Sequence, residues 1–176
     1  SESAREKVIR LIEEAVSNGA TIECGGRIPP HLTQCWFYER TILTGVTKDM
    51  AVMREESFGP VAAICKVGSF QEALDLANHT DFGLGASIFT SSMDEAFTAY
   101  NILEAGMVWV NNPLIDNDAL PFGGWKMSGI GREMGRQGLD AFRQTKMGVI
   151  DTKPEIQEWW YPYSDDWFYS GKGRQV

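Results

Sequence analysis

The sequence predicts an α/β fold in which strands and helices alternate along the chain. Three short segments, at residues 61–67, 86–90 and 107–111, have the apolar and β-branched content of buried strands. Two amphipathic segments separate them, and these begin at Ser69 and Ser92, each followed three residues later by glutamate. This spacing is typical of a helix N-terminus. Because the connections are short, we expect a parallel βαβαβ sheet with right-handed crossovers and flanking helices.

A helix is also expected at the start of the chain, where Ser3 and Glu6 have the spacing of a capping box. Apolar residues follow at helical spacing, and Gly19 lies where a left-handed C-cap belongs. Extended segments are expected next, at Thr21–Glu23 and within the aromatic and β-branched stretch 36–44. The apolar stripe of the helix consists of Val8, Ile9, Leu11, Ile12, Ala15 and Val16.

Beyond residue 111 the sequence predicts a long loop rich in proline and glycine, a helix from Ile130 to Phe142 and a strand from Gln144 to Asp151. The last segment, residues 152–176, is strongly aromatic, so we expect it to pack on this chain or on a neighbour. The predicted organisation is therefore one domain at residues 1–151 followed by an aromatic extension.

Composition argues against several classes of partner. The net charge of −8 over 176 residues disfavours nucleic acid or an anionic membrane surface. The apolar runs are too short to span a bilayer. Three cysteines form an odd set without framework spacing, so we expect a reducing compartment, with the cytoplasm as the default location.

The stretch from Glu55 to Val61 allows two interpretations. In the first, two solvated acids precede a Gly-Pro turn that leads into a strand. In the second, the rigid turn presents the Glu56 carboxylate to two adjacent hydroxyls, as on a ribose, and lays the Phe58 ring against a planar group. The spacing alone favours the first.

The glycine-rich stretch from Pro121 to Gly135 does not match a phosphate-binding loop. It lacks the Gly-Lys-Ser/Thr run of a Walker A motif. Its Gly129-x-Gly131-x-x-x-Gly135 spacing is one residue too long for the dinucleotide fingerprint, and it follows a loop instead of a strand. These glycines are therefore expected to serve backbone packing.

The cysteines and histidines do not predict a metal site or a nucleophile. Cys24, His31 and Cys35 lack zinc-site spacing and a fourth ligand. Cys65 lies in an apolar segment, where a free cysteine behaves as a small hydrophobe.

Several blocks occur together in one order, and in that order the chain resembles the aldehyde dehydrogenase superfamily over about residues 1–151. The resemblance implies that the chain is the C-terminal portion of the catalytic domain, ending in the strand that joins an oligomerisation sheet. The blocks are Thr41-Ile42-Leu43, Glu55-Glu56-x-Phe58-Gly59-Pro60-Val61, Ala77-Asn78 with Gly83-Leu84-Gly85-Ala86, Gly106-x-Val108-Trp109-Val110-Asn111, and Pro121-Phe122-Gly123-Gly124-x-Lys126-x-Ser128-Gly129-x-Gly131-Arg132-Glu133.

The same resemblance implies a parent enzyme that oxidises an aldehyde to a carboxylate with NAD or NADP through a cysteine thioester. The family's nucleophilic cysteine, its general-base glutamate and its dinucleotide-binding half belong to upstream motifs that are not found here. The chain also begins without methionine and directly on a helix. We therefore expect a segment of a longer homo-oligomeric enzyme, with no catalytic residue and no activity of its own.

Five positions match functional residues of the family. The resemblance places Glu56 on the nicotinamide ribose with Phe58 beside it, Phe122 in the wall of the aldehyde tunnel, and Leu114 and Asp116 in the loop at its entrance. Asn111 precedes that loop and is interpreted as structural. The loop is acidic where many relatives are aromatic, which favours a small cationic or polar aldehyde.

Two alternatives stay open. The chain could be a non-catalytic binding or structural module that keeps the aldehyde dehydrogenase scaffold. A reductase of the same superfamily, acting on an acyl phosphate or acyl thioester, would also carry these blocks. One further departure, Arg40 where the family often has proline, concerns only the entry to a strand.

Overall fold

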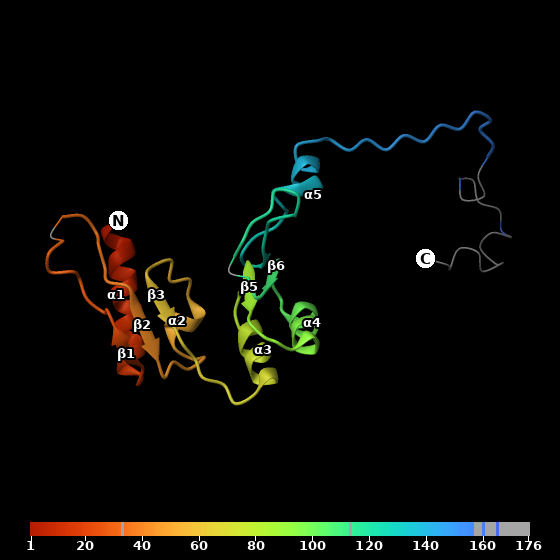
Figure 1. The fold of residues 1–176 in the computed structure, drawn as a ribbon. Coiled ribbons are helices and arrows are strands. Elements are labelled where there is room, and N and C mark those ends of the chain that lie inside the picture. The colour runs from red at the N-terminus through yellow and green to blue at the C-terminus, as the bar shows by residue number, and fades with distance from the viewer. Residues whose placement is uncertain (33, 113, 157–159, 161–164, 166–176) are drawn as a thin grey trace. The chain divides into compact units, whose positions relative to one another are not determined.

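The computed structural model divides the chain into two units, Ser1–Arg143 and Gln144–Val176 (Figure 1). Every strand among the described residues belongs to the first unit. The described residues are 1–32, 34–112, 114–156, 160 and 165.

The first helix, α1 (Glu2–Ser17), is capped by Ser1, whose Oγ accepts a hydrogen bond from the Ala4 N–H at 3.3 Å. The prediction of a cap at Ser3 is therefore wrong. The Ser3 hydroxyl instead lies 3.1 Å from the Ser1 hydroxyl, and Ser1 satisfies the free N–H group of the first turn. Gly19 has a φ of 101°, as expected for a C-cap glycine.

Next to α1, the strands β1 (Thr21–Cys24), β2 (Thr41–Thr44) and β3 (Val61–Ala63) form a three-stranded sheet in the order β1-β2-β3. β1 is antiparallel to β2, and β3 is parallel to β2. The short helix α2 (Ala51–Arg54) follows β2. The buried apolar cluster of this region consists of Val8, Ile12, Ala15, Ala20, Leu43, Val46 and Met50.

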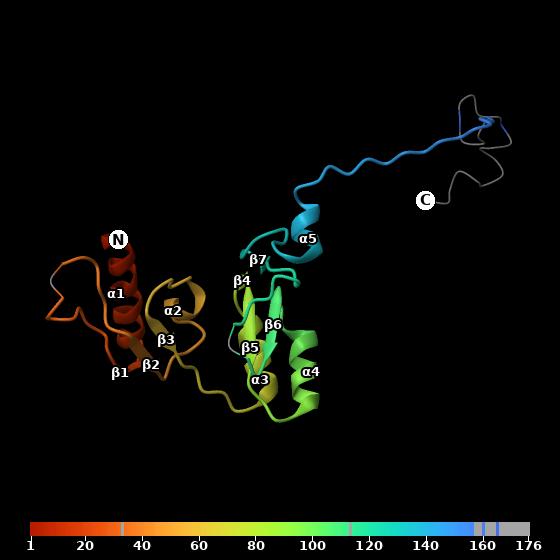
Figure 2. The same ribbon diagram turned by 45° about the horizontal axis from the view of Figure 1, so that its top comes forward.

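A second group of elements follows, with the strands β5 (Gly85–Ile88) and β6 (Met107–Val110) paired in parallel. Two helices, α3 (Phe70–Asn78) and α4 (Met93–Ile102), lie beside this pair (Figure 2). Their own buried cluster contains Leu74, Ala99 and Leu103, with Phe70, Ala86, Ile88 and Val108 packed against it.

The expected N-termini of α3 and α4 are confirmed. The Ser69 Oγ accepts from the Glu72 N–H at 3.1 Å, and the Ser92 Oγ accepts from the Glu95 N–H at 3.3 Å. The Glu72 carboxylate also accepts a hydrogen bond from the Gly68 N–H at 2.6 Å. Local side-chain bonding therefore fixes where both helices begin.

The α/β class is confirmed, but the three predicted strands do not form one sheet among the described residues. β5 and β6 pair as expected, whereas β3 pairs with β2. The first predicted strand, 61–67, also ends early, at Ala63. Exposed and half-buried residues alternate from Val61 to Val67, and Ile64 is 49% exposed. This apolar run is thus not covered on both faces, as a buried parallel strand would be.

The glycine-rich region continues the fold with β4 (Phe82–Gly83) and β7 (Trp125–Lys126), which pair antiparallel. The predicted helix at 130–142 is reduced to α5 (Gly135–Asp140). Left-handed backbone at Gly129, Gly131 and Met134 prevents an earlier start. Glu133, moreover, gives both its backbone groups to Phe122, at 2.7 and 2.8 Å.

The second unit has no strand among its described residues, so the segment Gln144–Asp151 is not a strand within this chain. Its apolar side chains are open: Met147 is 85%, Val149 78% and Ile150 89% exposed. Most of the aromatic extension, including Trp159, Tyr161, Tyr163, Trp167, Phe168 and Tyr169, lies outside the described residues. Among the described helices, none has the length and apolarity required to cross a membrane.

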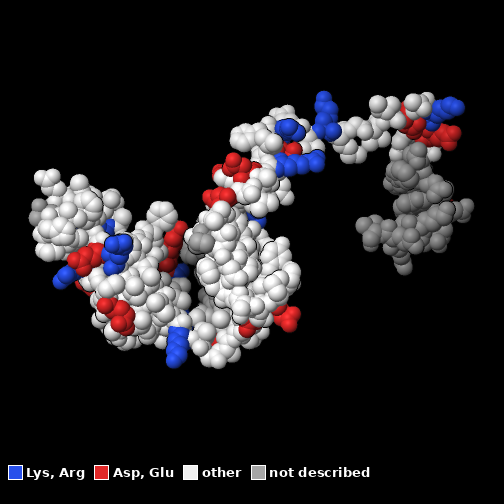
Figure 3. Space-filling model, viewed as in Figure 1, with Lys and Arg blue, Asp and Glu red and all other residues white. Residues whose placement is uncertain are grey.

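Large apolar side chains also remain exposed on the first unit. Met93, Phe97 and Tyr100 follow one another at helical spacing along α4, and each is more than 60% exposed. The face over α3 and α4 that Figure 3 shows carries few charged residues. Such a surface is typical of one that another part of a protein covers.

The core of the first sheet can be tested on two neighbouring residues of β2. Leu43 is fully buried, whereas Ile42 on the opposite face is 38% exposed. We expect Leu43→Ala to lower the free energy of unfolding by about 3 kcal/mol, because it leaves a cavity. Ile42→Ala is the matched control and should cost about 1 kcal/mol or less. Urea denaturation measures both, and equal losses would contradict this assignment of the core.

Candidate functional site

The turn before β3 is anchored to α1 by one of its two acidic residues. Arg10 of α1 donates to both Glu55 carboxylate oxygens, at 2.5 and 3.3 Å. The Glu55 N–H also bonds to the Ala51 carbonyl oxygen at 2.8 Å, which closes α2. Glu55 is therefore a structural residue, fixed through both its backbone and its side chain.

This contact shifts the ionisation of both partners. The hydrogen bond from Arg10 lowers the pKa of Glu55, and the nearby charges of Arg10, Lys7 and Arg54 act in the same direction, against a smaller desolvation effect. The same bond raises the pKa of Arg10. Both side chains are exposed, so the pair positions the turn more than it stabilises the fold.

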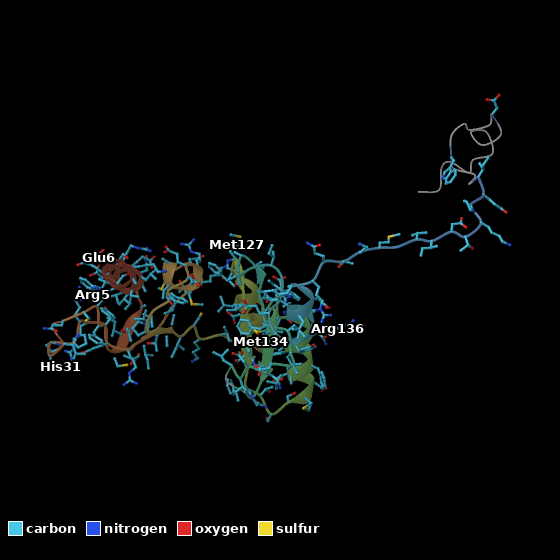
Figure 4. The ribbon with its side chains drawn as sticks, turned by 90° about the horizontal axis from the view of Figure 1, so that it is seen from above. Arg5, Glu6, His31, Met127, Met134 and Arg136 are labelled. Carbon is cyan, nitrogen blue, oxygen red and sulfur yellow. The ribbon has the colours of Figure 1, made fainter. Side chains whose placement is uncertain are left out.

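Glu56, the neighbouring acid, is left free. It is exposed, and it makes no hydrogen bond or ion pair with any residue that the structure describes. It lines a hollow of about 450 Å³ together with Leu84, Met127 and Ser128, of which Met127 is labelled in Figure 4. Its two carboxylate oxygens remain available as acceptors.

Phe58 projects from the same turn in an unusual conformation. Its side chain is 87% exposed and its φ is 42°, a left-handed value that a bulky residue rarely adopts. The next residue, Gly59, packs directly on α1, since a Cβ there would lie 2.3 Å from Val8 Cγ2. Strain of this kind persists only where surrounding contacts hold it, and it gathers at functional sites.

A second group of predicted site residues follows the end of β6. The Asn111 side chain copies a peptide group, because its Oδ1 accepts from the Thr90 N–H at 2.9 Å and its Nδ2 donates to the Thr90 carbonyl oxygen at 2.8 Å. The Asn111 N–H bonds to the Ile88 carbonyl oxygen. The β5–β6 ladder is thus extended past its last residues, and the structural interpretation of Asn111 agrees with this geometry.

The loop that carries Leu114 and Asp116 leaves from this point. Leu114 is 65% exposed with a φ of 55°, and Asp116 is exposed. The Trp109 indole N–H donates to the Ile115 carbonyl oxygen at 2.9 Å. The two predicted entrance residues therefore flank a backbone group that is bonded to β6.

Phe122, the third predicted tunnel residue, lies at the far end of the same loop and is half-buried. Its backbone pairs with Glu133 as an isolated antiparallel bridge. Two glycines next to it serve close packing, as predicted: a Cβ on Gly123 would lie 2.7 Å from the Gly131 carbonyl oxygen, and one on Gly124 would lie 2.6 Å from Ser128 Cβ. The prediction is wrong for Gly129 and Gly131, which have open space at the Cβ position and positive φ values instead.

Lys126 is a structural residue of this region that the sequence did not indicate. Its Nζ donates to the carbonyl oxygens of Asn78 and Thr80, at 2.8 and 3.0 Å, and pairs with Glu104 at 2.6 Å. Asn78 itself bonds to the Ile102 carbonyl oxygen and the Glu104 N–H. Lys126 and Asn78 thus join the C-terminal end of α3 to that of α4, where cations are favoured.

The sequence predicts neither a nucleophile nor a metal site among the cysteines and histidines. The hydrogen bonds of Cys24 and Cys65 go to backbone carbonyl oxygens, and among the described residues no hydrogen bond joins a cysteine to a histidine or a carboxylate. Within that same part of the chain, no cluster of three or more potential ligands could hold a metal ion.

The sequence did not predict Arg10 or Trp109 as parts of the site. Arg10 and Glu55 are 45 positions apart, so no local pattern connects them. Trp109 belongs to the Gly106–Asn111 block, which gives no indication of a role in the loop. Its partner is a backbone carbonyl, which leaves no signature in the identity of Ile115.

A family model described as the aldehyde dehydrogenase family matches residues 1–147. The chain belongs to this family. An aldehyde dehydrogenase of Paenarthrobacter nicotinovorans is 45% identical over 146 residues, which cover 83% of this chain and 31% of that protein. The chloroplastic betaine aldehyde dehydrogenase of Amaranthus hypochondriacus is 41% identical over 161 residues, covering 92% of this chain and 32% of that protein.

Solved aldehyde dehydrogenase structures agree. A betaine aldehyde dehydrogenase of Staphylococcus aureus, in complex with NAD+, superimposes with a TM-score of 0.83 at 34% identity. The match covers 92% of this chain and 32% of that one. The present chain thus spans about a third of the length of the aldehyde dehydrogenases it matches.

The Arg10–Glu55 pair predicts a pH-dependent contribution to stability in this aldehyde dehydrogenase chain. Because the pKa of Glu55 is lower in the folded chain than its ordinary value of 4.5, the contribution is fully present above pH 4.5. It is lost as pH falls through the folded-state value. Arg10→Gln should therefore lower stability slightly at neutral pH and leave it unchanged in acid.

Urea titrations at several pH values provide the measurement. Glu55→Gln should reproduce the neutral-pH loss, and the double variant should add nothing further, since either change removes the same contact. A loss of equal size at every pH would show that Arg10 acts through packing instead.

Proposed function

We propose that this chain forms the C-terminal portion of the catalytic domain in an NAD(P)+-dependent aldehyde dehydrogenase that oxidises an aldehyde to a carboxylate. The proposal rests on the different surroundings of two adjacent acids in a chain of this family. Glu55 is bound by Arg10, and Glu56 is left without a partner in the described part of the chain. An exposed carboxylate without a protein partner is available to accept hydrogen bonds from a ligand.

The residues of the turn fit a dinucleotide. The Glu56 carboxylate has two free oxygens, which suit the two neighbouring hydroxyls of a ribose. Phe58 offers a ring that is 87% exposed, and a flat heterocycle could pack against it. When bound, NAD(P)+ supplies the acceptor for the hydride of the aldehyde. The turn contributes orientation, because its contacts with α1 keep Glu56 and Phe58 in place.

The chain is proposed to be inactive alone. The reaction of this family needs a thiolate that attacks the aldehyde carbon and a base that activates water. Among the described residues, no cysteine has a hydrogen bond with a histidine or another basic side chain. The nucleophile and the base are therefore assigned to the part of the enzyme outside this chain.

A small cationic or polar aldehyde is the proposed substrate. The exposed Asp116 carboxylate stands in the loop next to Leu114, and Phe122 lies at the end of that loop. A negative group at a site entrance attracts cations and raises their local concentration. Relatives that carry the names betaine aldehyde dehydrogenase and aminoaldehyde dehydrogenase, the latter of Pisum sativum, support the same class.

A homo-oligomer in the cytoplasm completes the proposal. The segment Gln144–Asp151 has open apolar side chains and no strand partner among the described residues, so it could add to the sheet edge of a neighbouring subunit. The three cysteines are free, which suits a reducing compartment.

The full-length gene product tests the function directly. We expect it to form NADH or NADPH in the presence of betaine aldehyde, an aminoaldehyde or a neutral aldehyde, and we expect the present chain alone to form none. Full-length protein that reduces neither cofactor with any of these would favour the non-catalytic scaffold. Activity only in the reverse direction, on acyl phosphates or thioesters, would favour the reductase.

The role of Phe58 can be separated from its strain by two substitutions. Phe58→Gly removes both the ring and the cost of a positive φ, so we expect it to stabilise the fold by about 1 kcal/mol. Phe58→Ala removes the ring but keeps the strained backbone. Both should raise the KM for NAD(P)+ of the full-length enzyme by about fivefold, as expected for the loss of one aromatic contact. An unchanged KM in both would remove Phe58 from the cofactor site.

Asp116→Asn tests the substrate class. We expect kcat/KM for a cationic aldehyde to fall by about threefold, the scale of an exposed charge interaction, with no change for a neutral aldehyde of similar size. High salt should erase the difference by screening. Asp118→Asn is the matched control in the same loop. An equal effect on the neutral aldehyde would contradict an electrostatic role for Asp116.

A further inference from the structure

One hydrogen bond holds the middle of the entrance loop. The Trp109 indole N–H donates to the Ile115 carbonyl oxygen at 2.9 Å. Among the residues that the structure describes, this is the only hydrogen bond made by Leu114, Ile115 or Asp116. The ends of the loop have other attachments, such as the bond from the Gly135 N–H to the Asp118 carbonyl oxygen. The shape of the middle therefore depends on Trp109.

The Trp109 ring is itself held by the neighbouring strand. In the β5–β6 register, Ser87 lies opposite Trp109 and Gly85 lies opposite Met107, so Gly85 is the diagonal neighbour of the ring on the same face. A Cβ added to Gly85 would lie 2.5 Å from Trp109 Cζ3 and 3.0 Å from Cη2. The missing side chain of Gly85 thus provides the space that the indole occupies while its N–H bonds to the loop.

The backbone around the loop needs such a restraint. Asn111 and Leu114 both have positive φ values, 53° and 55°. Asn111 is held there by its two bonds to Thr90, but Leu114 has no hydrogen bond of its own among the described residues. A strained, exposed residue relaxes unless a neighbour is fixed, and the neighbour that is fixed is Ile115.

We infer that Trp109 is a positioning residue for the aldehyde site, with Gly85 as the residue that makes its position possible. Its indole N–H keeps the loop in the shape that places Leu114 and Asp116 at the substrate entrance. This inference rests on the proposed function, because it concerns how the same site selects its aldehyde. Trp109 need not touch the substrate: it acts through the Ile115 carbonyl.

Two variants of the full-length enzyme disturb this contact in different ways. Trp109→Phe keeps an aromatic ring but removes the N–H donor. Gly85→Ala keeps the indole and pushes it away, and it adds no backbone strain, because Gly85 is not among the glycines with positive φ. Trp36→Phe is the matched control: Trp36 stacks on Arg5 with 4.9 Å between the guanidinium carbon and the ring centroid, in a different part of the chain.

The order of the loop is measured without any catalytic assay. An Asp-specific endoprotease cleaves before Asp116 and Asp118, and mass spectrometry follows these cuts in the native enzyme. We expect Trp109→Phe and Gly85→Ala to speed cleavage before Asp116 by about fivefold, the factor for one neutral hydrogen bond. Trp36→Phe should cleave at the wild-type rate. If the Trp109→Phe variant is cleaved before Asp116 at the wild-type rate, the inference is overturned, whether or not the enzyme oxidises an aldehyde.

Steady-state kinetics test the link to substrate. We expect the KM for the aldehyde to rise by about fivefold in both variants, with kcat and the KM for NAD(P)+ within twofold of wild type. A uniform fall in kcat, or an equal rise in both KM values, would indicate general structural damage and overturn the inference. If the wild-type enzyme oxidises no aldehyde, the proposed function fails, and the substrate role of Trp109 fails with it. The protease experiment still shows whether the bond from Trp109 to the Ile115 carbonyl oxygen orders the loop.

Discussion

The parallel pairing of β5 with β6 is the constraint on which the rest of this region depends. Both strands are four residues long, so the pair needs support at its ends. Asn78 and Lys126 join the helices α3 and α4 near the start of β6, and Asn111 extends the ladder past its end. The loop with the predicted entrance residues begins at this extended end, where ligands of such sheets bind.

Side-chain amides provide much of the support at the ends of the β5–β6 pair, because short strands offer few backbone partners. Asn78 and Asn111 each satisfy one donor and one acceptor of a distant backbone segment. A free backbone group inside a fold is costly, and an asparagine can replace a peptide group without another strand. The Ala-Asn and Val-Asn blocks of the sequence therefore have a structural explanation that is independent of chemistry.

Much of the fold could be predicted from the sequence, because its signals are local. Ser69 and Ser92 cap the helices that they were expected to begin, and Gly19 ends α1 with a positive φ. The errors arise where distant contacts decide. The helix expected at Ile130 is interrupted because Glu133 pairs with Phe122, and β3 pairs with β2.

The candidate site likewise contains residues that could be named from the sequence and residues that only the folded chain reveals. Glu56, Phe58, Leu114, Asp116 and Phe122 could be named from sequence blocks because they are matched by position. The residues that hold them could not. Arg10 reaches Glu55 across 45 positions, and Trp109 contacts a backbone oxygen that any residue at 115 would offer. No local sequence pattern indicates the contacts of either side chain.

The apolar stripe along α4 affects the behaviour of this chain in solution. Met93, Phe97 and Tyr100 form an exposed apolar stripe that favours self-association. The net charge of −8 opposes this association, because identical molecules repel one another. Repulsion between exposed charges acts over about 10 Å at 0.1 M ionic strength and shortens as salt is added, whereas apolar attraction does not weaken in this way. Low ionic strength should keep the molecules dispersed, and salting should drive them together through α4.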